Sequence, residues 1–379
     1  MIGFWLILAL LVLAWMAMVF ILATRESILL YAEEKRQQPL LLTVRKRTDI
    51  DQEHFLLELE ASGCFANRLP AFQPGQYLNL EIPVNEKQRI KRAYSLSSWS
   101  ARPKHYTLGI KREEQGKASG WMHRQLKTGS QIRVSRPRGQ FILQNAEARA
   151  YVFIAGGIGI TPLRAMIQFI VSKHKHKTGC PPVYLFYSCR ESQQFCYFAE
   201  FRQLASIHRN FHFIPLLTGS EQSWNGERGR VDSNRLQQQV REFAQASYYL
   251  CASSSMMESL CGQLYEAGIS KQQIHFESFG VSSHSGTACQ HPIELNGQVF
   301  HFDNEPSLFH AIENEGFPID GDCRSGSCGR CKTNLIAGKV RYLNQPEIRL
   351  KADEILPCCC LPESKLILRN IAFAENEIP

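Results

Sequence analysis

A group of cysteines near the carboxyl end limits which kinds of site this chain can form. Residues 321–331 read GDCRSGSCGRC and place Cys323, Cys328 and Cys331 in a glycine-rich loop. Three consecutive cysteines follow in the segment PCCCLP. The chain has an odd total of 13 cysteines, and 7 of them fall in its last quarter. This distribution does not resemble a paired disulfide framework and indicates reduced thiols around one metal site.

The spacing inside the loop distinguishes two kinds of metal site. Cys-x4-Cys-x2-Cys followed by a distant fourth cysteine is the plant-type [2Fe–2S] spacing. Glycines at such a site let backbone N–H groups approach the negatively charged sulfur atoms. Structural zinc sites usually combine two Cys-x2-Cys knuckles, which this loop does not provide. The spacing therefore favours an iron–sulfur cluster over zinc.

Charge is unevenly distributed along the chain. Residues 1–287 contain 34 Lys and Arg against 22 Asp and Glu, whereas residues 288–379 contain 9 against 13. This contrast suggests that an acidic carboxyl-terminal domain docks on a basic body or on a partner. The basic residues are scattered and are not interleaved with aromatic residues, which argues against a nucleic-acid partner. A chain of 379 residues is expected to form two or three domains.

The amino-terminal segment is apolar. No charged side chain occurs from Ile2 to Thr24, and about 20 apolar residues suffice for a transmembrane helix. A cleaved signal peptide would carry basic residues before the apolar run and a small-residue cleavage site, and neither is found. Basic residues follow the apolar run, so the positive-inside rule places the catalytic domains in the cytoplasm. We expect a single-pass membrane protein with an anchor over residues 1–24 and a juxtamembrane linker over residues 25–38.

Two further regions differ in their apolar periodicity. Residues 39–144 contain short alternating apolar runs separated by turns, which predicts an antiparallel β-barrel. Within it, GIKREEQGKASGWMHRQL (109–126) predicts a strand, a turn and a helix capped by Ser119, whose first N–H groups can bind phosphate. Residues 145–281 alternate strands and helices, which predicts an α/β domain with a parallel sheet.

The first strand of this α/β region leads into a glycine turn. The segment AYVFIAGGIGITPLRAMIQFIV (150–171) predicts a buried strand and then a helix, with Thr161 as its N-cap and Pro162 as its first residue. A glycine turn that opens a helix is a ready site for an anion. The turn residues are Gly156, Gly157 and Gly159.

Taken together, these segments resemble the ferredoxin–NADP reductase superfamily. The matching motifs are Arg-x-Tyr-Ser in RAYSLSS (92–98), Gly-Gly-x-Gly-x-Thr-Pro at 156–162, and the cysteine loop. The order of the segments is similar to that of reductases with a carboxyl-terminal ferredoxin domain, which serve oxygenases, desaturases and hybrid-cluster proteins. The resemblance implies a multidomain chain: a transmembrane helix, a FAD-binding β-barrel (39–144), an NAD(P)-binding α/β domain (145–281), and a linker with a β-grasp ferredoxin domain (282–379).

The resemblance also implies roles for individual residues of the flavin domain. Tyr94 would stack on the isoalloxazine, Ser95 would lie near its N5 atom, and Arg92 would neutralise the pyrophosphate. These roles suit their chemistry, because an aromatic face fits a flat ring and a guanidinium fits phosphate. The other implied flavin-binding residues are Lys111, Gly116, Lys117 and Ser119.

In the second domain, the resemblance places Cys251 and Glu277 with Ser95 at the flavin–nicotinamide junction as catalytic residues. The usual Cys-Gly-Pro-x-x-Met motif is present only as Cys251 and Met256, without Gly-Pro. Ser188 and Arg190 would lie at the adenine ribose, where an Arg favours NADPH slightly over NADH.

For the cluster, the resemblance places the fourth ligand four residues before a proline. Pro362 then selects Cys358 to join Cys323, Cys328 and Cys331, with Cys359 or Cys360 as alternatives.

The implied activity is NAD(P)H:acceptor oxidoreduction through FAD and a [2Fe–2S] cluster, with FMN as the alternative flavin. NAD(P)H gives two electrons as a hydride and the cluster accepts one, so a flavin is needed between them. The anchor favours a membrane-bound di-iron desaturase or hydroxylase as the protein acceptor. Two alternatives are a hybrid-cluster protein as acceptor and an electron-carrier or redox-sensing module without nucleotide turnover. A quinone-linked respiratory dehydrogenase is disfavoured, because its sodium-pumping member carries the domains in the reverse order.

Overall fold

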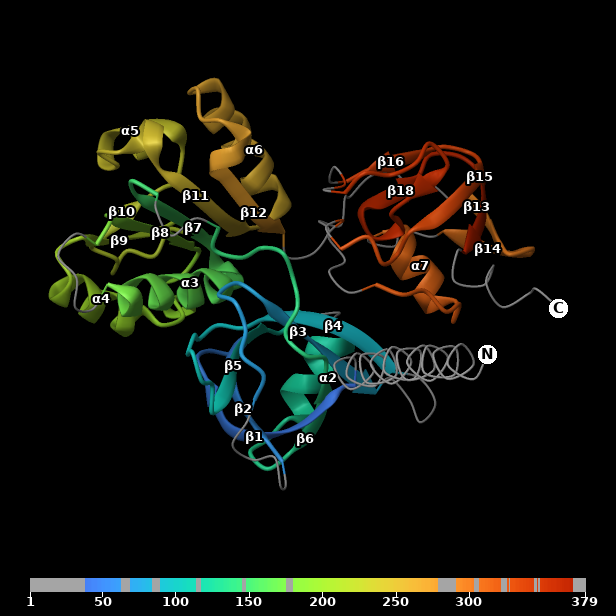
Figure 1. Cartoon of the computed structure of the whole chain (residues 1–379), viewed down its shortest axis with the longest axis horizontal. Coiled ribbons are helices and arrows are strands. Elements are labelled where there is room, and N and C mark those ends of the chain that lie inside the picture. Colours follow the sequence, from blue (N-terminus) through green and yellow to red (C-terminus); the bar gives the residue numbers. More distant parts are fainter. Residues whose placement is uncertain are drawn as a thin grey trace, which may run out of the picture.

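The computed structural model describes most of the chain after the apolar segment. The described residues are 38–62, 69–83, 89–113, 117–144, 148–174, 180–278, 291–302, 307–321, 326, 328–343, 346 and 348–370. The predicted anchor, nearly all of the juxtamembrane linker and the linker before the last domain lie outside them. Within the described ranges, no helix has both the length and the apolar character that a membrane span requires. The predicted multidomain, sheet-rich architecture is confirmed (Figure 1).

The first unit is an antiparallel barrel around an apolar core. Its strand order is β4-β3-β6-β1-β2-β5, and a bridge between Leu96 and Leu108 joins the two ends of the sheet. In β2, Phe55, Leu57 and Leu59 are buried in alternation with more exposed side chains, as a strand with one face on the core requires. Its elements are β1 Leu40–Asp49, β2 His54–Ala61, β3 Tyr77–Pro83, β4 Arg89–Ser95, β5 His105–Lys111, α2 Lys117–Gln125 and β6 Gln131–Val134.

The second unit is a six-stranded parallel sheet of order β10-β9-β8-β7-β11-β12. Helices α3 and α4 cover one face of the sheet, and α5 and α6 cover the other (Figure 1). The strands are β7 Tyr151–Gly156, β8 Val183–Cys189, β9 Phe211–Leu217, β10 Glu227–Arg228, β11 Ser247–Ala252 and β12 Ile274–Ser278. The helices are η2 Gly157–Gly159, α3 Ile160–Lys173, η3 Ser192–Gln194, α4 Phe198–Ile207, α5 Ser233–Gln239, η4 Phe243–Gln245, α6 Ser254–Glu266 and η5 Lys271–Gln273.

Two predicted helix starts are wrong, one by two residues and the other by three. The turn η2 already coils the glycines, so α3 begins at Ile160 with Gly159 as its N-cap, and Thr161 is its second residue. Pro162 is then the third residue, which the first turn tolerates because its N–H would have no partner in the helix. Helix α2 begins at Lys117, so Ser119 lies inside its first turn, where its Oγ accepts the Glu113 N–H at 3.0 Å.

The third unit is a mixed sheet of order β14-β13-β19-β15-β17 with a helix packed on it. Strands β13 and β19 are parallel, as expected for a β-grasp arrangement. Asn296 and Gly297 have φ angles of 52° and 82° and form the tight turn between β13 and β14, for which Asn-Gly is favoured. The elements are β13 His291–Leu295, β14 Gln298–Phe302, α7 Leu308–Asn314, β15 Thr333–Ala337, β16 Val340–Tyr342, β17 Glu354–Ile355, η6 Pro357–Cys359, β18 Cys360–Pro362 and β19 Leu366–Asn370.

A polar network joins the barrel to the parallel-sheet unit. The Arg164 guanidinium donates to the Ser97 carbonyl at 2.6 Å and to the Glu200 carboxylate at 2.9 Å, and it lies 4.2 Å above the Tyr197 ring. The Tyr197 hydroxyl in turn lies 2.9 Å from Ser97 Oγ. Because each group in this network is held by several partners, the two units keep one relative position.

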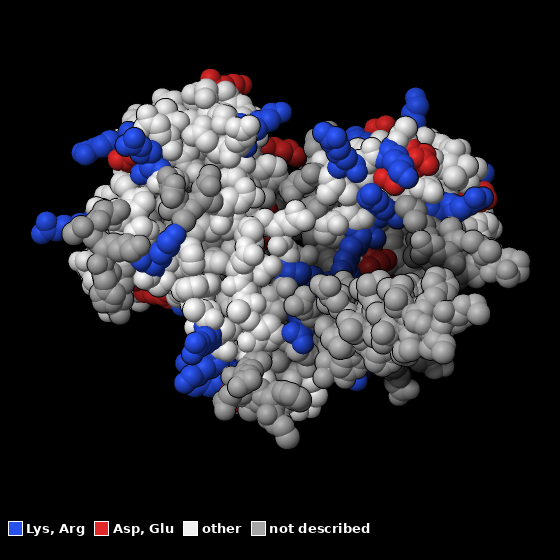
Figure 2. Space-filling model, in the orientation of Figure 1, with Lys and Arg blue, Asp and Glu red and all other residues white. Residues whose placement is uncertain are grey.

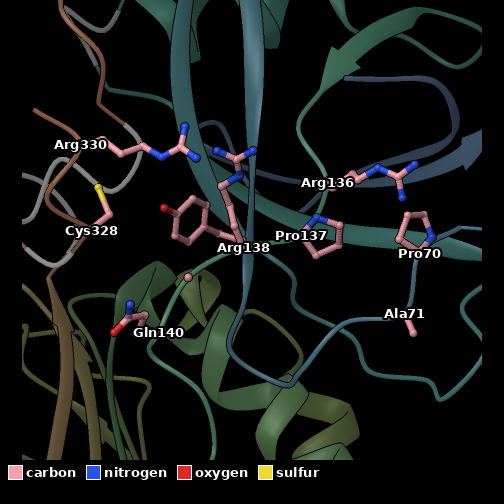
Figure 3. Close-up of a pocket in the computed structure, with 10 residues that line it drawn as sticks. Pro70, Ala71, Arg136, Pro137, Arg138, Gln140, Cys328 and Arg330 are labelled. Atoms are coloured by element: carbon pink, nitrogen blue, oxygen red, sulfur yellow. The ribbon is translucent and has the colours of Figure 1, made fainter. Parts of the chain in front are cut away.

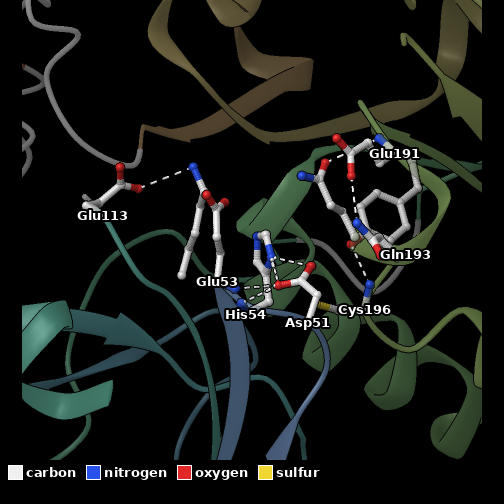
Figure 4. Close-up of polar contacts among 10 residues, drawn as sticks. Asp51, Glu53, His54, Glu113, Glu191, Gln193 and Cys196 are labelled. Carbon is white, nitrogen blue, oxygen red and sulfur yellow. Dashed lines mark hydrogen bonds and ion pairs between the residues drawn. The ribbon is translucent and has the colours of Figure 1, made fainter. Parts of the chain in front are cut away.

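A hydrogen-bonded carboxylate at the turn between β1 and β2 gives a prediction for acid stability (Figure 4). Asp51 accepts the backbone N–H groups of Glu53 and His54 at 2.7 and 2.6 Å, and its Oδ2 lies 2.9 Å from His54 Nδ1. Burial raises the pKa of Asp51, but these hydrogen bonds outweigh it and hold the pKa below 3.8. The carboxylate therefore stabilises the fold above pH 3.8, and its contribution is lost as the pH falls through the lowered pKa.

We expect Asp51→Asn to lower the free energy of unfolding by about 1–3 kcal/mol at pH 7, since charged acceptors make the stronger hydrogen bonds. Urea unfolding of both proteins at pH 7 and near pH 3 measures this, and the gap should narrow at the lower pH. Asp49→Asn is the matched control, because Asp49 is 59% exposed and should change stability little. An equal loss in both variants would contradict the role of Asp51.

Candidate functional site

The three residues predicted as catalytic meet where the barrel joins the parallel sheet. Ser95, at the end of β4, is 3% exposed, and its Oγ donates to Glu277 Oε2 at 3.4 Å across 182 residues of sequence. Cys251 is fully buried and lies opposite Glu277 in the pairing of β11 with β12. Burial, reinforced by the Glu277 carboxylate, raises the pKa of the Cys251 thiol well above its ordinary value, so the thiol stays neutral.

The glycine turn packs directly against the end of β11. A Cβ on Gly159 would lie 2.0 Å from the Cys251 carbonyl oxygen, and one on Gly156 would lie 2.9 Å from the Ala252 Cβ and 3.4 Å from the Met256 sulfur. Gly157 has φ +52°, and no atom lies within 4 Å of a Cβ placed on it. Space is therefore open on the Cβ side of Gly157, beside the start of α3, which leaves room for a phosphate group next to the turn.

Ser188 offers a second fit for a nucleotide. It is the last residue but one of β8 and is 7% exposed, and its Oγ is buried without a hydrogen-bond partner among the described residues. A buried hydroxyl left unpaired costs about 1–3 kcal/mol, so a ligand hydroxyl at this place would remove that cost. Arg190 follows with an exposed side chain, close enough in sequence to reach the same ligand.

The predicted flavin residues lie along β4, β5 and the start of α2. Tyr94 is half-buried against the barrel core, and Lys111 lies 3.6 Å from Glu113. Arg92, predicted to neutralise a phosphate, forms an ion pair with Glu313 of α7 at 3.3 Å. The charge contrast between the units favours such docking, but this pair was not predicted, because its two residues lie 221 positions apart. Gly116 lies outside the described residues, as does the side chain of Lys117.

The predicted cluster ligands lie in the third unit. Cys331 and Cys358 are 2% and 1% exposed and pack with Cys359 in one group of buried side chains. Cys360 packs instead into the main core of the unit. Cys328 is half-buried. Among the described residues, no group of three or more His, Cys, Asp or Glu side chains is arranged around a common point, and Cys323 lies outside them.

A cavity of about 490 Å³ separates the barrel from the cysteine loop (Figure 3). Arg136 and Arg138 line it from the barrel, and Cys328 and Arg330 line it from the third unit. In Figure 3 the guanidinium groups of Arg138 and Arg330 point toward one another. Arg136 Nε is buried and has no hydrogen-bond partner in the described part of the chain. The cysteine loop therefore lies across this cavity from the barrel. The cavity was not predicted from the sequence, because RPRG at 136–139 has the pattern of an ordinary basic turn.

Comparisons with known proteins match this organisation. The family description "Oxidoreductase FAD-binding domain" matches residues 41–142, "Oxidoreductase NAD-binding domain" matches 153–262, and "2Fe-2S iron-sulfur cluster binding domain" matches 293–363. These three matches follow one another in the order of the three units.

Two curated relatives align over most of their length. The chain is 26% identical over 322 residues to the glycine betaine monooxygenase reductase subunit of Pseudomonas aeruginosa, covering 78% of this chain and 87% of that protein. It is 25% identical over 308 residues to the carnitine monooxygenase reductase subunit of Escherichia coli, covering 80% and 90%. Among solved structures, phthalate dioxygenase reductase superposes with a TM-score of 0.65 at 23% identity, covering 87% of this chain and 98% of that one, which is a similarity of fold.

Proposed function

We infer that this chain, a member of the ferredoxin–NADP reductase superfamily that ends in a 2Fe–2S domain, is an oxidoreductase that passes electrons from NAD(P)H through FAD to its cluster and on to a protein acceptor. The observation that carries this function is the junction of the first two units. Ser95 Oγ lies 3.4 Å from Glu277 Oε2, so the motif of the FAD-binding domain meets the end of the NAD-binding sheet. The roles of the individual residues below are our proposals.

FAD can accept a hydride and release electrons singly, which connects a two-electron donor to a one-electron cluster. We propose that the residues of the chain bind and orient the reactants and act as neither acid nor base. Glu277 holds the buried Ser95 hydroxyl in one direction, and the neutral Cys251 thiol keeps water and charge away from the junction. The open glycine turn at Gly157 binds nucleotide phosphate, and Ser188 binds a ribose hydroxyl.

For the acceptor, we propose an oxygenase. The support is that both curated relatives are named as reductase subunits of monooxygenases and align over most of their length. We further propose that residues 1–24 anchor the chain in the membrane with its catalytic domains in the cytoplasm, and that the acceptor is itself membrane-bound, a desaturase or hydroxylase. This rests on the apolar sequence alone. Detergent extraction of membranes, followed by identification of the bound protein that oxidises the reduced cluster, tests both parts.

Anaerobic rapid mixing of the purified full chain with NADH or NADPH tests the electron path. The expected result is bleaching of the flavin absorbance followed by reduction of the cluster. A flavin that stays oxidised with both nucleotides would favour the alternative of an electron-carrier or redox-sensing module without nucleotide turnover.

Because the Ser188 hydroxyl has no partner, its removal should affect the stability of the free protein and the binding of the nucleotide differently. We expect Ser188→Ala to leave the free energy of unfolding unchanged or slightly increased, because it removes a buried group that has no partner. The same change should raise the KM for the nucleotide about fivefold, which is the loss of about 1 kcal/mol of binding. Thermal unfolding and steady-state reduction of ferricyanide, which accepts electrons from the flavin, measure the two effects.

Ser97→Ala is the matched control, since the Ser97 hydroxyl is buried but has the Thr107 carbonyl and the Tyr197 hydroxyl as partners. It should lower stability and leave the KM unchanged. If Ser188→Ala lowers stability without changing the KM, Ser188 has a structural role and does not bind the nucleotide.

A further inference from the structure

An ion pair joins the barrel to the ferredoxin unit. Arg92 Nη1, on the edge strand β4, lies 3.3 Å from Glu313 Oε2, on α7. The side chains are 24% and 17% exposed, so the pair is largely shielded from solvent. The same Nη1 donates to the Lys91 carbonyl at 3.0 Å, so both of its N–H groups have partners.

Three further arginines lie between the same two units. Arg136, Arg138 and Arg330 line the cavity there, and Arg330 lies 3.6 Å from Asp320. Figure 2 shows Lys and Arg side chains at the junction between the ferredoxin unit and the rest of the molecule. Closing this junction brings guanidinium groups of both units together, and Glu313 places a negative charge there.

We propose that Glu313 and the flavin phosphate share Arg92, so that flavin binding and docking of the ferredoxin unit oppose one another. The proposal rests on the proposed function, in which Arg92 binds the phosphate of the flavin. It goes beyond that function by giving Glu313 a part in cofactor affinity, and by making the docked position of the ferredoxin unit depend on the cofactor.

The sign of the coupling follows from charge. A carboxylate and a phosphate that approach one guanidinium repel each other, and the attraction of the guanidinium for either is reduced by the presence of the other. Because coupling between two binding events is reciprocal, a carboxylate that weakens flavin binding is itself released when flavin binds. The holoprotein then holds its ferredoxin unit less tightly than the apoprotein does, which frees that unit to reach an external acceptor.

Glu313→Gln tests the proposal through affinity. Apoprotein of the full chain is titrated with FAD, and binding is followed by quenching of flavin fluorescence. The variant should bind FAD about three- to tenfold more tightly than the wild type, in the range of a partly shielded ion pair. The gain should shrink in high salt. Riboflavin, which lacks phosphate, should bind both proteins equally.

Two variants separate this effect from general changes in charge. Glu315→Gln removes the same charge from an exposed site two residues away and should leave FAD affinity unchanged. In an Arg92→Gln background, the gain in FAD affinity from Glu313→Gln should shrink, because only the direct repulsion between carboxylate and phosphate is left to relieve. FAD affinity that is unchanged or lower in Glu313→Gln, or a gain that extends to riboflavin, overturns the proposal. A wild-type chain that binds no flavin overturns the proposed function instead.

Discussion

Cys358→Ser is expected to abolish the cluster and leave the flavin reaction intact. The Cys358 thiol is 1% exposed and packs with Cys331 in one group of buried side chains. A serine hydroxyl is a poor replacement for a thiolate ligand of iron. The purified variant should lack the visible absorbance of the cluster and its iron. Electron output to a protein acceptor should fall to background, while NADH should still bleach the flavin at an unchanged rate.

The two neighbouring cysteines provide matched controls. Cys359→Ser should keep its iron. The Cys359 thiol lies in the same group of buried side chains, but it donates to the Leu356 carbonyl at 3.5 Å. Cys360→Ser should keep its iron and lower stability, because Cys360 is fully buried in the main core of the unit. Iron retained by Cys358→Ser and lost by Cys359→Ser would assign the fourth ligand to Cys359.

Gly159→Val is expected to disable the nucleotide site. Its Cβ would lie 2.0 Å from the carbonyl oxygen of Cys251, so the turn or the end of β11 has to move. A displacement of about 1 Å at a reacting site can cost about 10²-fold in rate, and we expect kcat/KM for NADH to fall by about that factor. Stopped-flow measurement of flavin reduction at several NADH concentrations checks this.

Gly262→Ala is the control for this substitution. Gly262 lies in α6, and no atom lies within 4 Å of a Cβ placed on it. It should leave flavin reduction unchanged and raise the free energy of unfolding by about 0.5–1 kcal/mol, as expected for a helix interior. Normal kinetics in Gly159→Val would mean that the turn does not hold the nucleotide as proposed.

Short-range periodicity predicted the barrel and the parallel-sheet unit, whereas the β-grasp unit was expected from the family resemblance. The alternation in β2 and the Asn296-Gly297 turn are decided by neighbours in sequence. The predicted starts of α3 and α2 are wrong. A 3₁₀ turn of glycines precedes α3, and in α2 the Ser119 hydroxyl accepts the Glu113 N–H from inside the first turn.

The contacts between units were not predictable from the sequence. The Arg92–Glu313 pair, the Ser97–Arg164 network and the arginine-lined cavity join residues far apart along the chain, and no local pattern specifies them. The resemblance to a family did bring Ser95, Cys251 and Glu277 to one expected junction. Their contact depends on a tertiary arrangement that periodicity alone does not give.

The most direct test of the electron path is the anaerobic addition of NADH to the purified full chain, with iron, zinc and flavin measured on the same sample. We expect the protein to contain flavin and iron. After NADH is added, the flavin should bleach, and the rhombic paramagnetic signal of a reduced [2Fe–2S] cluster should then appear. A protein that holds zinc in place of iron, or a cluster that stays oxidised after the flavin is reduced, would contradict this electron path.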